Sequence, residues 1–175
     1  MSIEIPLSQG KFATVDEADH EWLSQWRWSA MYSCGIWYAV RTQYLPGSTK
    51  THPKRKTILM HRQILGLGHA DKHQADHINH DGLDNRRENL RTCSNAENHF
   101  NLRKSKTHIG SHFKGVGWKS DRCKWRSRIK IGGKDIHLGY FSSEIDAAQA
   151  YDEAALKYFG EFACTNGSFR GKAVG

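Results

Sequence analysis

The hydrophobic pattern of the first 45 residues predicts short strands around one small helix. Apolar and polar residues alternate in KFATV (11–15), as in a half-buried strand, and GIWYAVRT (35–42) is rich in strand-favouring residues. Between these runs, Trp22, Leu23 and Trp26 recur at helical spacing. We expect these aromatic side chains to pack in a core.

The pattern of residues 112–160 predicts three strands followed by one helix. The runs HFKGVGWK (112–119), KWRSRIKI (124–131) and KDIHLGYF (134–141) are separated by turn residues, which is typical of an antiparallel meander. An amphipathic helix follows in SSEIDAAQAYDEAALKYFG, capped by Ser142 or Ser143 and ended by Gly160. Its apolar stripe is formed by Ile145, Ala148, Tyr151, Ala155 and Phe159.

Two stretches lack this periodicity and indicate connections. LPGSTKTHPKRK (45–56) combines proline, glycine and basic residues, and we expect a loop with a possible contact to phosphate. RKSKTHIGS (103–111) is the best linker candidate. The expected fold class is α+β. The expected organisation is a β-rich segment (1–57), a central domain (58–104), a linker (105–111), a C-terminal sheet-plus-helix domain (112–168) and a tail (169–175).

Charge indicates a polyanionic partner, nucleic acid before membrane. The formal net charge is +8, and residues 110–140 contain eight basic residues against two acidic ones. No apolar run reaches the ~18 residues of a membrane span. The four cysteines are isolated, which favours reduced thiols and a cytoplasmic protein. Without a heptad pattern, a monomer is expected.

Base stacking is the alternative role for the N-terminal aromatic residues.

Residues 74–101 crowd histidine, asparagine and carboxylate side chains together, and three interpretations compete. A calcium loop is nearly satisfied by the spacing from His77 to Glu88, but calcium requires a carboxylate oxygen where His77 offers nitrogen. A solvated polar loop explains the turn-forming Asp81, Gly82, Asp84 and Asn85. It does not explain Asp76 and His77 at the end of a strand.

The third interpretation is a hydrolytic metal site. Histidine can take a proton from water near neutral pH, and a hard cation can hold a phosphate oxygen. Asp76 and His77 are adjacent on an extended segment, so their side chains diverge. SNAE (94–97) is a capping box, which predicts a helix from Asn95 with Asn98 on its first turn.

This segment resembles the HNH endonuclease motif, a ββα-metal nuclease fold, of the phage-encoded homing type. The resemblance implies that His77 is the general base, that Asp76 and Asn98 hold the metal, and that Asn89 braces the loop. It implies Mg²⁺, with Mn²⁺ able to replace it, and action in a bacterial host. Arg86, Arg87 and Arg91 would contact phosphates or form surface salt bridges. His61 and His80 have no assigned part in this chemistry.

Residues 113–166 resemble the plant ethylene-response-factor (APETALA-type) DNA-binding domain. The resemblance rests on KGV, KWRSRI, LGYF, AAQAYDEAALKYFGEFA and Asn166. It implies a sheet whose exposed face enters the major groove of double-stranded DNA. The implied contact residues, with Arg126 added by strand alternation, are Lys114, Lys119, Arg126, Arg128, Lys130 and His137. Gly117 and Asp135 stand where the plant proteins have arginines, so their target sequence is not transferable.

Together these patterns predict a site-specific endonuclease that hydrolyses a DNA phosphodiester with one divalent metal and a histidine base. One active site in a monomer favours cutting a single strand. The alternative is a DNA-binding regulator with an inactive nuclease centre, and a further alternative is a nuclease acting on RNA or repair intermediates.

Overall fold

The computed structural model describes residues 1–68, 70–101 and 110–167, with only the backbone of His99. Most of the expected linker 105–111 and the tail 169–175 lie outside these residues. The chain forms two compact units that divide between Asn95 and Ala96, and each unit is described by itself.

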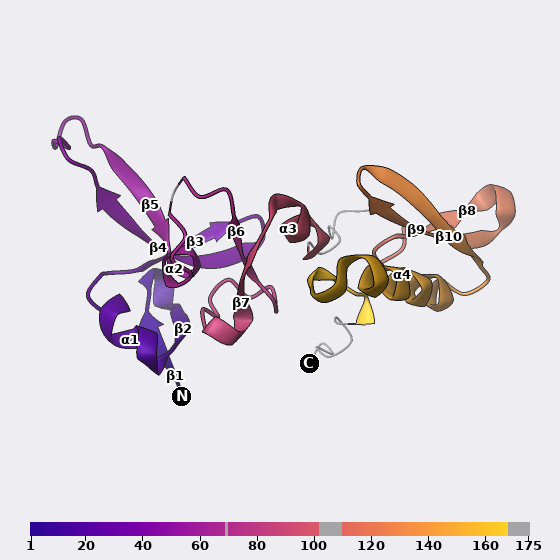
Figure 1. Cartoon of the computed structure of the whole chain (residues 1–175), viewed down its shortest axis with the longest axis horizontal. Coiled ribbons are helices and arrows are strands. Elements are labelled where there is room, and N and C mark those ends of the chain that lie inside the picture. The colour runs from indigo at the N-terminus through magenta and orange to yellow at the C-terminus, as the bar shows by residue number, and fades with distance from the viewer. Residues whose placement is uncertain (69, 102–109, 168–175) are drawn as a thin grey trace. The chain divides into compact units, whose positions relative to one another are not determined.

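The first unit contains three small antiparallel sheets (Figure 1). One pairs β1 with β2, one has the order β3-β4-β5, and one pairs β6 with β7. The strands are β1 (Ser2–Pro6), β2 (Phe12–Asp16), β3 (Ser29–Ser33), β4 (Ile36–Tyr44), β5 (Arg55–Leu59), β6 (Gln74–His77) and β7 (Leu90–Cys93). The helices are α1 (Glu17–Leu23), α2 (Met60–Ile64) and the short 3-10 turns η1 (Ser8–Gly10) and η2 (Arg87–Asn89).

One hydrophobic core joins the sheets of the first unit. It includes Val15 on β2, Leu23 on α1, Met60 on α2 and Leu90 on β7. Trp28 is buried in this core, and Trp22 and Trp26 pack against it, so the expected core role of the aromatic residues is confirmed. Because residues before and after position 57 share the core, the β-rich segment and the strands of the central segment fold together.

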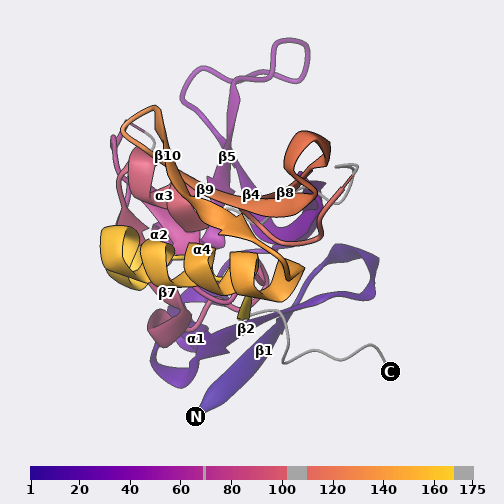
Figure 2. The same cartoon turned by 90° about the vertical axis from the view of Figure 1, so that its right-hand side faces the viewer.

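The β4–β5 hairpin extends beyond this core (Figures 1 and 2). Its strands pair from Val40–Leu59 out to Tyr44–Arg55, and the connecting loop covers residues 45–54. Nearly every residue from Thr42 to Arg55 is exposed. The loop predicted over 45–56 is therefore confirmed, except that its last two residues begin β5.

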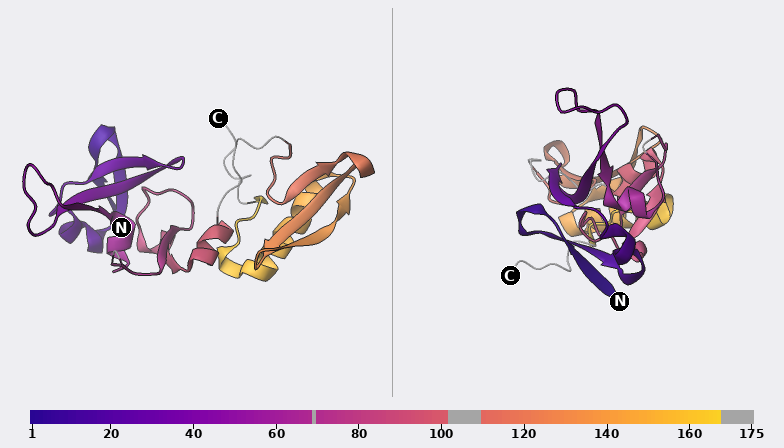
Figure 3. Two further views of the ribbon diagram at one scale, coloured as in Figure 1. Left: turned by 90° about the horizontal axis from the view of Figure 1, so that it is seen from above. Right: turned by 90° about the vertical axis from the view of Figure 1, so that its left-hand side faces the viewer.

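The second unit is a three-stranded antiparallel sheet lying on one long helix (Figure 3). The sheet has the order β10-β9-β8, with β8 (Val116–Lys119), β9 (Lys124–Ile131) and β10 (Lys134–Phe141). The helices are α3 (Asn95–Asn101), of which residues 96–101 belong to this unit, α4 (Glu144–Phe159) and the 3-10 turns η3 (Ser120–Arg122) and η4 (Gly160–Phe162). The predicted meander and helix are confirmed within a few residues.

Helix α4 packs its alanine-rich side against the sheet. Ser143 caps the helix by accepting hydrogen bonds from the amides of Ile145 and Asp146. Ala148 and Tyr151 are buried below the strands. Ile145 differs from the predicted stripe, since its side chain is 46 % exposed.

The described residues confirm a mixed α+β fold with several small antiparallel sheets, but not the ββα-metal layout. Strands β6 and β7 pair as that layout requires, whereas residues 96–101 of α3 belong to the other unit. No helix among the described residues is long and apolar enough to cross a membrane.

Candidate nucleic-acid interface

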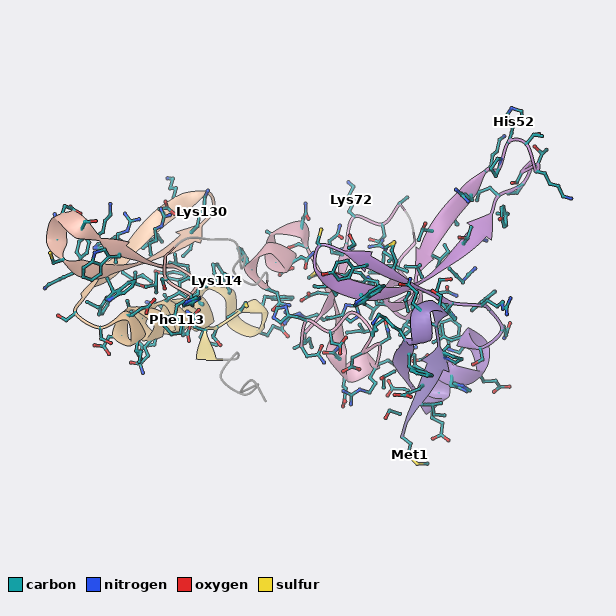
Figure 4. All side chains as sticks on the ribbon, turned by 180° about the vertical axis from the view of Figure 1, so that it is seen from behind. Met1, His52, Lys72, Phe113, Lys114 and Lys130 are labelled. Atoms are coloured by element: carbon teal, nitrogen blue, oxygen red, sulfur yellow. The ribbon has the colours of Figure 1, made fainter. Side chains whose placement is uncertain are left out.

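The β8–β9–β10 sheet has one apolar face and one basic face. Along β9, Ser127 and Ile129 are buried on the side that meets α4, whereas Arg128 and Lys130 are exposed. Figure 4 shows Lys130 on the side of the sheet away from α4. We call this side the outer face. By strand alternation and register its residues are Lys119, Lys124, Arg126, Arg128, Lys130, Asp135, His137 and Tyr140.

Cross-strand pairing orders the side chains of the outer face. His137 on β10 lies opposite Arg128, and Tyr140 lies opposite Arg126. The Arg128 guanidinium donates a hydrogen bond to the Asp135 carboxylate over 2.8 Å. The face thus combines five cations with one carboxylate, and it presents donors suited to phosphates and to base edges.

Lys114 is placed differently from the other expected contact residues. Its ammonium donates a 2.8 Å hydrogen bond to the backbone carbonyl of Phe100. Burial lowers the pKa of this side chain. Figure 4 shows Lys114 close to α4. Its assignment as a DNA contact stays a prediction, but this position favours a structural role.

Asn166 ties the end of the domain to its beginning. Its Oδ1 accepts from the Lys114 amide at 2.7 Å, and its Nδ2 donates to Asp152 at 2.9 Å and to the Lys114 carbonyl at 3.2 Å. The Asn166 amide donates to the same Asp152 carboxylate. Asn166 is buried, so the sheet rests on a firmly connected frame.

In the first unit, the three arginines expected near phosphates all hold carboxylates. Arg86 binds Asp84 and Glu88, and Arg87 makes a two-pronged contact to Asp19, with both distances 2.8 Å. Burial opposes ionisation of Asp19, yet its hydrogen bonds from Arg87 and Trp22 leave its pKa lowered.

The third of these arginines, Arg91, donates twice to Asp76, over 2.8 and 2.9 Å, and both side chains are largely buried. Of the two interpretations left open for these arginines, the structure shows ion pairs, and a contact with phosphate stays a prediction.

His77 lies in a buried cluster instead of at an open surface. Its Nε2 is 3.4 Å from the Asn85 side-chain oxygen, and its ring is 4.7 Å from that of His61. Tyr38 contacts both rings. Burial lowers the pKa of His77, and it lowers that of His61 to about 3. The Nδ1 of His61 has no hydrogen-bond partner among the described residues. Both imidazoles are therefore held neutral at pH 7.

Asn89 connects parts of the loop between β6 and β7 through its side chain. Its oxygen accepts from the Asn79 amide at 2.9 Å, and its nitrogen donates to the Asp84 carbonyl at 2.7 Å. These two hydrogen bonds close the turn.

The expected metal ligands come from different units. Asp76 lies on β6 of the first unit, and Asn98 lies on α3 of the second. Within the described residues, no three His, Cys, Asp or Glu side chains gather in a metal-binding group. Mg²⁺ binding stays a prediction, as do the monomeric state and the cytoplasmic location.

Comparison with known proteins finds relatives of the C-terminal domain. No protein-family model matches the chain. The chain is 45 % identical over 58 residues to the AP2-like ethylene-responsive transcription factor PLT2 of Arabidopsis thaliana, a match that covers 32 % of this chain and 10 % of that protein. It is 41 % identical over 58 residues to the Arabidopsis factor ANT and 43 % identical over 58 residues to CRL5 of rice, covering 32 % of this chain and 10 % and 9 % of those proteins. The chain thus spans about a tenth of the relatives it matches.

These relatives correct the predicted function. They are transcription factors, so the prediction of a metal-dependent endonuclease is contradicted, and the resemblance of residues 74–101 to HNH enzymes finds no support. The resemblance of residues 113–166 to the ethylene-response-factor domain is supported. Asp76, His77 and Asn89 are residue types that suit catalysis; in the structure Asp76 pairs with Arg91, His77 is buried and Asn89 donates to the Asp84 carbonyl.

Sequence reasoning missed several partners of these residues. The solvated-loop interpretation explains Asn85 only as a turn former, yet its side chain is fully buried and contacts His77. Asp19, the partner of Arg87, belongs to none of the motifs that the sequence pattern indicates. No local pattern identifies the Asp19–Arg87 contact, since the two residues are 68 positions apart.

Proposed function

We propose that the chain is a DNA-binding regulator that contacts duplex DNA through the outer face of the β8–β9–β10 sheet. The observation that carries the proposal is the one-sided placement of cations on a sheet whose other face is fixed to α4. Because α4 supports the sheet, the strands are already ordered before DNA binds, so binding costs little conformational entropy.

The two long strands β9 and β10 supply the dimensions that groove recognition needs. A two-stranded antiparallel ribbon fits into the major groove of B-form DNA. There, Arg126 and Arg128 are placed to donate to guanine edges, while Lys130 neutralises backbone phosphate. The matched relatives are named as transcription factors, which supports DNA regulation as the role of this domain.

Asp135 gives this chain its own recognition chemistry. Its carboxylate engages Arg128 on the outer face, where the resembling plant domains have an arginine instead. An acceptor beside Arg128 favours contact with a donor such as the cytosine amino group and disfavours nearby phosphate. The proposed target therefore differs in sequence from that of the plant proteins.

The polar cluster of the first unit serves this function as scaffold. The Asp76–Arg91 pair and the Asn89 contacts hold the β6–β7 connection in place. Buried ion pairs of this kind fix one arrangement of a loop, and removing one partner leaves a buried charge unpaired.

The test is selection of bound sequences from a randomised duplex pool, followed by binding measurements. The full chain should enrich a defined motif. An Arg126→Gln, Arg128→Gln double variant should bind that motif at least ~10-fold more weakly, because each good arginine–base pair contributes about 1–3 kcal/mol. A Lys157→Gln variant, changed on the exposed side of α4, is the control and should bind normally. Failure to enrich any motif, or equal binding by both variants, would reject the proposal.

A further inference from the structure

A second concentration of positive charge lies in the first unit, outside the region that matches the transcription factors. Residues 22–70 contain no aspartate or glutamate, but they contain seven lysines and arginines. The acidic residues of this unit lie on either side of this stretch. Residues 22–70 therefore carry charge of one sign, whereas the rest of the unit carries both signs.

Most of these cations belong to the β4–β5 hairpin. We call β4, β5 and the loop 45–54 the basic hairpin. His52 marks its loop, which stands away from the rest of the unit (Figure 4). Lys50, Lys54 and Arg55 are exposed, Lys56 is half-buried, and none of the four forms an ion pair among the described residues.

The side chains of the basic hairpin point to both sides of its strands. Lys56 shares a face with Arg41, because Gln43 pairs with Lys56 and Arg41 pairs with Ile58. Arg55, paired with Tyr44, belongs to the opposite face. A ribbon that is positive on both sides can be flanked by phosphates of two strands, as in a groove of duplex DNA.

A hollow of about 370 Å³ lies at the base of this ribbon, and Arg41, Lys56 and Arg62 line it. The Arg41 guanidinium stacks 4.3 Å from Trp26 and donates to Gln63. Arg62 donates to the carbonyls of Gly68 and His73. Two of the three cations are thus fixed in place, so the positive charge is present before any ligand arrives.

The contrast with Arg86, Arg87 and Arg91 shows which cations remain for a partner. Each of those arginines is neutralised by a carboxylate within 2.9 Å. Carboxylates are missing from the basic hairpin, and its lysines and arginines form no ion pair within the described residues of this unit. Uncompensated charge on an exposed hairpin costs stability through repulsion unless an anion binds there.

We infer that the basic hairpin is a second duplex-DNA contact, which binds backbone phosphates and adds affinity without reading sequence. It goes beyond the proposed function, since the match to the relatives covers only 32 % of this chain and supports the C-terminal domain alone. Two linked contacts on one DNA molecule raise affinity through effective concentration. The hairpin would also hold the protein on nonspecific DNA during the search for its target.

The test measures the salt dependence of binding by the full chain. The probe is a mixed-sequence duplex of about 30 bp, and the salt concentration runs from about 50 to 200 mM. The hairpin variant is Lys54→Gln, Arg55→Gln. The matched control is Arg27→Gln, Lys157→Gln, which removes the same charge from exposed positions elsewhere. A third variant, Lys54→Arg, Arg55→Lys, keeps the hairpin charge. Circular dichroism establishes that each variant is folded.

The hairpin variant should lower the slope of log K against log salt by about two, since each phosphate contact contributes roughly 0.9. The charge-conserving variant should keep the wild-type slope, and the matched control should lie close to it. Equal slopes for the hairpin and control variants would overturn the inference. So would a hairpin variant that weakens binding to single-stranded RNA of the same length but not to the duplex.

A variant of the outer face separates this inference from the proposed function. Arg126→Gln, Arg128→Gln should lower the slope independently of the hairpin change, and the two losses should add. If only the hairpin variant lowers the slope, the DNA contact of the outer face is rejected and that of the basic hairpin is retained. If only the outer-face variant lowers the slope, the DNA contact of the basic hairpin is rejected and that of the outer face is retained.

Discussion

Replacing Asp135 by asparagine should strengthen binding to mixed-sequence DNA. Asp135 is the one carboxylate on the outer face, and its 2.8 Å contact with Arg128 occupies a guanidinium that otherwise faces solvent. The substitution removes a negative charge and weakens the hold on Arg128, because a neutral amide oxygen is a weaker acceptor than a carboxylate. Asparagine keeps the size of the side chain. The protein should gain affinity and lose part of its discrimination between sequences.

The magnitude follows from two contributions. A carboxylate about 8 Å from a phosphate in water is repelled by about 0.5 kcal/mol, a factor slightly above two in affinity. A released Arg128 that contacts one more phosphate raises the salt slope by about 0.9. The cost in stability should stay below ~1 kcal/mol, because the Arg128 and Asp135 side chains are 49 % and 52 % exposed.

Fluorescence anisotropy with a labelled mixed-sequence duplex measures both effects, and thermal unfolding checks the fold. An Asp121→Asn variant is the control, since Asp121 is exposed on η3 and lies 3.9 Å from Arg122. We expect a gain of several-fold for Asp135→Asn and a smaller one for the control. Unchanged or weaker binding by Asp135→Asn would refute the placement of this carboxylate near DNA.

Three further predictions concern the remaining groups. Lys130→Met should lower the salt slope by about one, whereas Lys114→Met should leave it unchanged because that ammonium is bonded to the Phe100 carbonyl; equal effects in anisotropy would contradict this difference. Asn166→Ala should destabilise the second unit by about 2–4 kcal/mol in urea unfolding, because Asp152 and the Lys114 backbone each lose a hydrogen bond to the Asn166 side chain. A loss below ~0.5 kcal/mol would argue against a stabilising role of these hydrogen bonds. Burial lowers the pKa of His61 from 6.5 in the unfolded chain to about 3 in the folded protein, so its contribution to stability is complete above pH 6.5 and is lost as the pH falls toward about 3. His61→Phe should flatten this dependence of the free energy of unfolding on pH. An unchanged dependence would count against burial of the ring.

The local part of the fold could be predicted from the sequence. Strands β9 and β10 have a two-residue alternation broken by Gly132 and Gly133, and α4 has an alanine stripe with a serine cap. These signals depend only on neighbouring residues, so they survive without knowledge of tertiary contacts. Ile145 was placed wrongly because helical periodicity identifies a face but not the point at which the sheet beneath it ends.

The role of the polar segment could not be predicted, because it depends on partners distant in sequence. Asp76 and His77 look like reactive groups when read alone. The structure places Arg91 on the first and packs His61, which is 16 positions earlier, against the second. Burial and pairing decide whether such residues react or support a loop, and periodic patterns give neither. The sequence shows the basic residues of the hairpin, but only the structure shows that they form no ion pairs while Arg86, Arg87 and Arg91 do.

The most direct test of the account is nuclear magnetic resonance of the ¹⁵N-labelled chain during titration with its selected duplex. We predict the largest shifts at the Nε–H groups of Arg126 and Arg128 and at the amide of His137, with little change along the exposed side of α4 at Glu153 and Lys157. Shifts concentrated on α4, or an outer face that does not respond to saturating DNA, would contradict the claim that this sheet reads DNA.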